Sequence, residues 1–253
     1  MNNSQDWVRH FESNLKEQRI DWTQATQITN EEKKQIIRSL QAWQLGETSE
    51  GKNLRRAAEK YAKQQDDWAY LDAIDLFIKE EQKHGENLGL YLDRIGAKRL
   101  KKDLGDTLFR KVRYFATNIE IWTATVIIVE SFAQIYYKAI ADATNCPLLQ
   151  EICVDILKDE AHHIRFQYER LHQITKPRTM LWKRITFAAY HLMFYIIMIA
   201  IWFGHRKALK AGGLDFKKYS SKARRKFRFV RHKIENVNTQ KRELDCLEIE
   251  QSH

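Results

Sequence analysis

The sequence has little of what interrupts helices. Among its 253 residues there are only 2 prolines and 9 glycines, while alanine, leucine, isoleucine, glutamate, lysine and arginine fill long stretches. Because proline and glycine mark the turns of strand-rich proteins, their scarcity argues against strands joined by turns and favours long helices. With 43% apolar residues, the chain can still bury a substantial core. We therefore expect an all-α fold.

Cysteine is also scarce. Cys146, Cys153 and Cys246 form no Cys-x-x-Cys pair and leave one thiol over in any disulfide scheme. This usage excludes a disulfide framework and is typical of a reducing compartment with buried, unreactive thiols. The opening residues, MNNSQDWVRHFESNLKEQ, have no apolar core of the kind a secretory signal needs. A cytoplasmic location is the expectation that follows.

Acidic residues are nearly missing from residues 206–242. This basic tail contains 14 lysines and arginines against two acids, in a chain whose net charge is +10. Just before it lies ITFAAYHLMFYIIMIAIWFG, residues 185–204, in which His191 is the only strongly polar side chain. A helix of this length and composition is long enough to cross a bilayer.

Three interpretations of residues 185–204 stay open. A single spanning helix would put the basic tail and the rest of the chain on opposite sides of the membrane, against the positive-inside tendency. A helix lying on the anionic inner face of the membrane would use the cations that flank it, together with the tail, over residues 185–242. The third is a fifth helix buried against the rest of the protein or in a homodimer interface.

Caps and apolar spacing predict four helices before this segment, at about residues 30–62, 68–95, 106–143 and 147–176. Thr29 or Asn30 caps the first helix, and Pro147 occupies the first turn of the fourth. We divide the chain into an N-terminal segment (1–30), a four-helix region (31–175), and a hydrophobic helix with a basic helical tail (176–253).

The pattern Glu-x-x-His occurs twice, as Glu81 with His84 and as Glu160 with His163. At about 100° per residue, positions three apart share one face of a helix, so both side chains can reach one point. In both helices this face continues the apolar stripe and is therefore the buried one. A buried carboxylate needs partners, and a metal ion is one candidate.

The fourth helix contains a second acid and histidine at the same spacing, because Asp159 and His162 are also three residues apart. Their face is shared with the charged residues Asp155, Glu169 and Arg170, so we assign this pair to the flank of the helix. The predicted ligands of the fourth helix are Glu160 and His163.

The first and third helices should each add a carboxylate at the same level along the bundle as the two Glu-x-x-His pairs. In an antiparallel pair, residues at one level are equally far from the connecting turn, which matches Glu50 with Glu81 and Glu130 with Glu160. Glu130 also stands alone in an apolar run. Glu47, one turn before Glu50, serves nearly as well, and pairing of Glu50 with a lysine or arginine stays open. A break of the helix at the glycines of GETSEG, residues 46–51, also stays open.

The order Glu, Glu-x-x-His, Glu, Glu-x-x-His over residues 31–175 resembles the ferritin-like diiron-carboxylate superfamily. The DEAHH run at 159–163 is most similar to the fourth-helix motif of the alternative oxidases, and its Asp-Glu-x-x-His start resembles ribonucleotide reductase small subunits and rubrerythrins. The resemblance implies an antiparallel four-helix bundle around two iron ions, or manganese, with open positions for dioxygen. The implied ligands are Glu50, Glu81, His84, Glu130, Glu160 and His163.

The same resemblance implies that Glu80 and Asp159, each directly before a ligand glutamate, accept the imidazole N–H of the opposite helix. It implies an O2-activating oxygenase or oxidase acting on an apolar or membrane-associated small molecule. The sequence contains no rubredoxin-like cysteines, so a separate reductase or the substrate itself would supply electrons. Unlike in the alternative oxidases, the hydrophobic helix follows the fourth bundle helix.

Two other classes of function stay open. In a tRNA-modifying diiron hydroxylase, the basic tail with Phe216, Tyr219, Phe227 and Phe229 would hold nucleic acid. A non-enzymatic iron-binding protein is the other class, although it gives the tail and the hydrophobic helix no role. Residues that would act in catalysis beyond the metal centre are not identified by the sequence.

Overall fold

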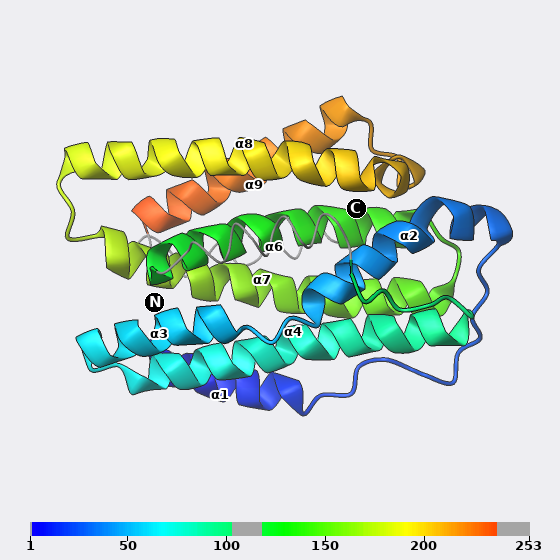
Figure 1. Cartoon of the computed structure of the whole chain (residues 1–253), viewed down its shortest axis with the longest axis horizontal. Helices are drawn as coiled ribbons and strands as arrows, with labels where there is room; N and C mark the ends of the chain where they lie inside the picture. Colours follow the sequence, from blue (N-terminus) through cyan, green and yellow to red (C-terminus); the bar gives the residue numbers. More distant parts are fainter. Residues whose placement is uncertain (1, 103–117, 237–253) are drawn as a thin grey trace.

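The computed structural model describes residues 2–102 and 118–236, and every regular element within them is a helix (Figure 1). The all-α prediction is therefore confirmed. The helices are α1 (Ser4–Leu15), α2 (Asn30–Glu47), α3 (Lys52–Gln65), α4 (Trp68–Arg94), α6 (Ile119–Asp142), α7 (Pro147–Thr175), α8 (Met180–Ala211) and α9 (Phe216–Glu235).

The core is an antiparallel bundle formed by α4, α6, α7 and the broken pair α2 and α3. Helix α1 covers the bundle on the side of α4, whereas α8 and α9 cover it on the side of α6 (Figure 1). Caps expected from the sequence start two of these helices: the Thr29 hydroxyl accepts the backbone N–H of Glu32 before α2, and Pro147 opens α7.

The prediction of one continuous helix over about 30–62 was wrong. Helix α2 ends at Glu47 and α3 begins at Lys52, with Gly51 between them in the left-handed region at φ 61°. A Cβ atom at Gly51 would also lie 2.5 Å from Cδ1 of Ile78. Glycine is required here by both the backbone angle and the close approach to α4.

The N-terminal segment contains a helix that the sequence analysis did not predict. Asn3 and Asp6 form a reciprocal capping box at the start of α1. The apolar side of this helix buries Trp7, Val8 and Phe11 against the bundle. Residues 2–15 therefore form part of the wall around the core.

Two predicted segments fall partly outside the described residues. The third helix was expected to begin near residue 106, but only its part from Ile119 onward, α6, is described. The basic tail is described as far as residue 236 and contains α9.

The hydrophobic helix α8 is longer than the predicted 185–204. Both α6 and α8 are long and apolar enough to cross a membrane by length and composition alone. However, 83% of the apolar stretch of α6 is buried within the protein, against only 28% of that of α8. Helix α6 is thus a core helix, while α8 lies on the bundle with one face buried and the other exposed.

Candidate metal centre

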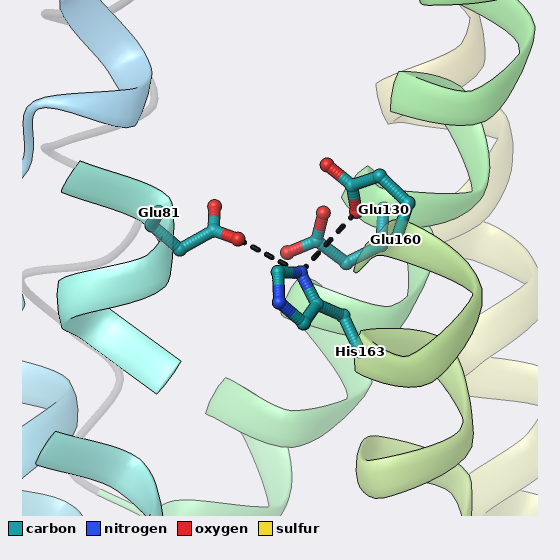
Figure 2. Close-up of side chains that lie close together, drawn as sticks. All are labelled: Glu81, Glu130, Glu160 and His163. Atoms are coloured by element: carbon teal, nitrogen blue, oxygen red, sulfur yellow. Dashed lines mark ion pairs between the residues drawn. The ribbon is translucent and has the colours of Figure 1, made fainter. Parts of the chain in front are cut away.

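Three carboxylates and one imidazole meet in the middle of the bundle (Figure 2). Glu81 comes from α4, Glu130 from α6, and Glu160 and His163 from α7. One candidate ligand atom from each of these side chains lies within 4.8 Å of all the others. The glutamate of the second helix, both residues of the fourth-helix motif and the lone glutamate of the third helix are therefore brought to one point.

A second group of ligand atoms adjoins the first. It consists of Glu47, Glu81 and His84, again with one atom of each within 4.8 Å of the others. Because Glu81 belongs to both groups, the two sets are neighbours and share a carboxylate. Together they offer four carboxylates and two imidazoles, which is the donor set expected for two divalent ions.

The prediction of Glu50 as a ligand was wrong, and Glu47 takes its place. The Glu50 side chain is 68% exposed and pairs with Lys52, whereas Glu47 is buried. The antiparallel matching assumed a continuous helix, in which both residues share a stripe. Because α2 ends at Glu47, the chain turns away before Glu50 and carries it into solvent.

Each ligand histidine is oriented by a carboxylate on the opposite helix. Nε2 of His84 lies 2.9 Å from Oδ2 of Asp159, and Nε2 of His163 lies 2.7 Å from Oε2 of Glu80. These are the two pairs that the resemblance implied. A carboxylate can only accept a hydrogen bond, so Nε2 carries the donated hydrogen in both rings. Nδ1 of each ring is then left facing the cluster.

Several polar atoms at the centre of the cluster are buried and have no hydrogen-bond partner. They include Nδ1 of His84 and of His163, Oε1 of Glu81 and both carboxylate oxygens of Glu160. Nδ1 of His163 lies 2.9 Å from Oε1 of Glu81 but lacks the angle of a hydrogen bond. Buried groups of this kind are normally paired, and a cation at the point they face would pair all of them.

The carboxylates of the cluster are electrostatically unfavourable without a cation. Burial, followed by the negative charges of Glu81 and Glu160, raises the pKa of Glu47 well above its usual value. Burial and the same two neighbours, with Glu160 the stronger, also raise the pKa of Glu130 well above normal. Two of the four carboxylates thus resist ionisation until a positive charge is supplied.

The pKa values of the two histidines are raised as well. Burial alone would lower the pKa of His163, but the charge of Glu81 and hydrogen bonds to surrounding glutamates raise it well above normal. Burial would also lower the pKa of His84, but its hydrogen bond to Asp159 together with the negative charges of Glu81 and Asp159 raises it. In turn His163 lowers the pKa of Glu81 despite burial. Protons on the imidazoles therefore take over part of the role that a metal cation would have.

Helix α1 and the residues after it complete the shell around the histidines, which sequence reasoning missed. The side-chain amide of Asn14 donates to Glu80, and it donates to Oδ1 of Asp159 at 2.8 Å. The Arg19 guanidinium donates to both oxygens of Asp159 at 2.6 Å. One available signal was electrostatic, because two buried acids require cationic or hydrogen-bonding partners.

Gly85 was also missed. A Cβ atom at this position would lie 2.7 Å from Cγ2 of Thr48 and 3.1 Å from the backbone carbon of Glu47. The absence of a side chain thus lets the end of α2 approach α4 directly beside His84. A glycine following a ligand histidine inside a helix was the signal, because helices keep such a residue where another backbone comes close.

The assignment of Asp159 and His162 to the flank holds for His162 only, because Asp159 is fully buried. His162 is exposed, its ring lies tilted against that of His10 at 4.4 Å between centroids, and it belongs to neither ligand group. The neighbouring charges Asp155, Glu169 and Arg170, expected at the surface, are buried beneath the N-terminal residues. Trp7 of α1, for example, donates to Glu169 at 3.0 Å.

No protein-family model matches the sequence, and the search of curated proteins finds no match. Solved structures do match. A point mutant of an R2-like ligand-binding oxidase with an anaerobically reconstituted Mn/Fe cofactor aligns with a TM-score of 0.66 at 18% identity, over 90% of this chain and 92% of that one.

A second mutant of an R2-like ligand-binding oxidase, with an aerobically reconstituted Mn/Fe cofactor, has a TM-score of 0.60 at 15% identity, over 90% and 93% of the two chains. A third gives 0.56 at 16% identity. The bundle and the helices on both sides of it are therefore covered by the likeness. The chain has the ferritin-like fold of the R2-like ligand-binding oxidases.

Proposed function

We propose that this protein is an O2-activating oxidase with a dinuclear metal centre. The six ligands would be Glu47, Glu81, His84, Glu130, Glu160 and His163. Two iron ions, or one manganese and one iron, fit a set of four carboxylates and two imidazoles. The structurally similar oxidases, which were reconstituted with a Mn/Fe cofactor, support this choice of metals.

The orientation of the two histidines is the observation that carries the proposal. Asp159 and Glu80 hold the Nε2–H of His84 and His163, and the unpartnered Nδ1 atoms face the glutamates. A pair of satisfied core histidines would have both ring nitrogens bonded. Here one nitrogen of each ring is anchored and the other is presented, which is the arrangement found around metal-ligating histidines.

The residues around the cluster keep it dry and fixed. The ring of Phe77 packs edge-on against His163 at 4.8 Å between centroids, and Phe11 lies 6.0 Å from it on another side. The Tyr137 hydroxyl donates to Oε1 of Glu47 at 2.6 Å and holds that carboxylate in place. Bound metal ions would supply one-electron chemistry toward dioxygen in this water-poor site.

The substrate and the source of electrons are also proposals. An apolar or membrane-associated small molecule suits a buried centre in a protein with an exposed apolar helix. Cys146 and Cys153 are free and buried, which leaves them unsuited to pass electrons from the surface. We therefore expect a separate reductase or the substrate to reduce the centre. We also propose that the protein works in the cytoplasm.

Metal analysis with controlled oxygen exposure tests the proposal. The purified protein is stripped, loaded anaerobically with iron, or with iron and manganese, and then exposed to air. We expect about two metal ions per chain, oxygen uptake and the absorption of an oxo-bridged centre. The Glu160→Ala and His163→Ala variants should lose most of the metal, and His162→Ala is the matched control. Equal metal content in all three variants, or wild-type protein that binds no metal, would refute the proposal.

A further inference from the structure

The outward face of α8 is a continuous apolar strip. Its large members are between 41% and 66% exposed: Leu181, Ile185, Leu192, Ile196, Ile199 and Phe203. They recur at spacings of three, four or seven residues, so they lie along one side of the helix. We call these six residues the α8 apolar face. Soluble monomers rarely expose an apolar patch that runs the length of a long helix.

The opposite side of α8 is firmly packed on the protein. Phe194 stacks on Phe132 at 5.6 Å and on Phe227 at 4.4 Å between ring centroids. The Tyr190 hydroxyl donates to Glu120 of α6 at 2.7 Å. The inner side of α8 therefore packs on the protein, and the α8 apolar face is exposed on the other side of the helix. Helix α8 itself lies at the outer edge of the fold (Figure 1).

The charges around this face have one sign. Helix α8 contains no acid, and cations close the strip at both ends, with Arg184 at one end and Arg206, Lys207 and Lys210, all exposed, at the other. The Arg206 guanidinium lies 5.9 Å from the centre of the Phe203 ring, at the edge of the strip. Over residues 180–234 there are 14 lysines and arginines and a single acid, Asp215.

We propose that the α8 apolar face docks on the surface of an anionic lipid bilayer. Helix α8 would lie in the membrane plane, with its apolar side chains among the upper acyl chains and its terminal cations, together with those of α9, at the lipid phosphates. The helix does not span, because its inner side stays packed on α6 and α9. This inference goes beyond the metal centre and does not depend on it.

A second copy of the chain fits this face poorly. In a symmetric dimer through α8, the cations at the ends of one helix would meet cations of the other, and α8 has no acid to pair with them. Nucleic acid would leave the apolar strip exposed to water. Two of the four tail aromatics expected to stack on bases are also engaged, because Tyr219 and Phe227 are buried against α8. An anionic bilayer fits both features, because its phosphates pair with the cations and its acyl chains cover the apolar strip.

The proposal is tested by sedimenting the metal-loaded full-length protein with vesicles of phosphatidylcholine alone and of phosphatidylcholine mixed with phosphatidylglycerol. We expect binding to the mixed vesicles that weakens as salt is raised. Ile196→Glu places a charge in the middle of the strip at a 61% exposed position and should weaken binding at least about tenfold. Leu90→Glu is the control, because Leu90 is 40% exposed on α4, a helix on the opposite side of the bundle from α8 (Figure 1).

Trp182 supplies an independent readout, because it is 61% exposed near the start of the strip. Brominated acyl chains should quench its fluorescence on binding, and the Trp182→Phe variant should lose this quenching. Three results would overturn the proposal: no binding to either vesicle, equal binding of Ile196→Glu and wild type, or a stable dimer that Ile196→Glu converts into a monomer without any vesicle binding.

Discussion

Asp159 on α7 and His84 on α4 face each other with Oδ2 and Nε2 2.9 Å apart, and the same contact is made in reverse by Glu80 and His163 at 2.7 Å. Each acid directly precedes a ligand glutamate on its own helix. The two Glu-x-x-His helices therefore orient each other's histidines. Removing either acid should disturb the ring on the opposite helix before it disturbs the fold.

Asp159→Asn tests this relationship. The amide keeps the size of the side chain but loses the charge that fixes the Nε2–H tautomer of His84. We expect metal affinity to fall by about 10- to 100-fold, measured by competition with a chelating dye, while the helical content is retained. Glu169→Gln is the matched control, since Glu169 is another buried acid of α7 that binds α1 and touches no ligand histidine. Equal affinity of the two variants would contradict the role given to Asp159.

Gly85→Ala should act through the end of α2. The added Cβ would meet backbone atoms of Thr48 and Glu47, which have no freedom to move aside as a flexible side chain would. We expect a loss of roughly 1–3 kcal/mol in the free energy of unfolding. Displacement of Glu47 should also lower the bound metal from two ions per chain toward one, measured by elemental analysis.

Gly89→Ala is the control for this change. Gly89 lies one turn further along α4, and a Cβ there would meet only side-chain atoms of Arg99, whose flexible end can shift. It should leave the metal content unchanged. If Gly85→Ala also bound the full complement of metal, the close approach of α2 and α4 would not be what positions Glu47.

Much of this centre was readable from the sequence because it depends on helical period and on antiparallel matching. Glu81, His84, Glu160 and His163 follow from the three-residue spacing, and Glu130 from its isolation in an apolar run. These regularities hold wherever a helix is unbroken. Five of the six expected ligands accordingly lie in the two ligand groups.

The site residues that were predicted wrongly or not predicted share a different physical origin. Glu50 was preferred over Glu47 because it matches Glu81 better across the expected turn. The break that removes it lies at Gly51, whose close contact with Ile78 of another helix is not visible in the sequence. The contacts of Asn14 and Arg19 with Asp159 join residues about 140 positions apart, which periodicity does not reveal. Local pattern predicts which face of a helix is buried, but tertiary packing decides where that helix stops and what covers it.

The exchange of Glu50 for Glu47 is itself testable. Glu47→Gln removes a buried carboxylate that accepts from Tyr137 and faces His84. We expect this variant to lose at least one metal ion per chain, as measured by elemental analysis. Glu50→Gln changes an exposed side chain and should keep the wild-type metal content. The reverse ranking would restore Glu50 as the ligand and refute the helix break as the reason for excluding it.

The stability of the metal-free protein should depend on pH in a defined direction. Glu47 and Glu130 have an ordinary pKa of 4.5, which the fold raises well above normal through burial and neighbouring acids. The pKa values of His84 and His163 are raised from 6.5. For all four groups the folded state binds protons more tightly than the unfolded state. Their contribution is complete below the ordinary pKa and is lost as the pH rises through the folded pKa.

The metal-free protein should therefore melt at a higher temperature at about pH 5.5 than at about pH 8. Metal reverses this order, because protons compete with the cation for the same atoms and binding weakens in acid. Free metal at a thousandfold excess over its dissociation constant adds about 4 kcal/mol to the folded state. The gap in Tm between loaded and metal-free protein should thus be widest at the higher pH. A calorimetric scan of both forms at both pH values measures it. Equal Tm values at the higher pH, with metal confirmed as bound, would mean that the ion sits outside the buried cluster, and the proposed oxidase centre would lose its support.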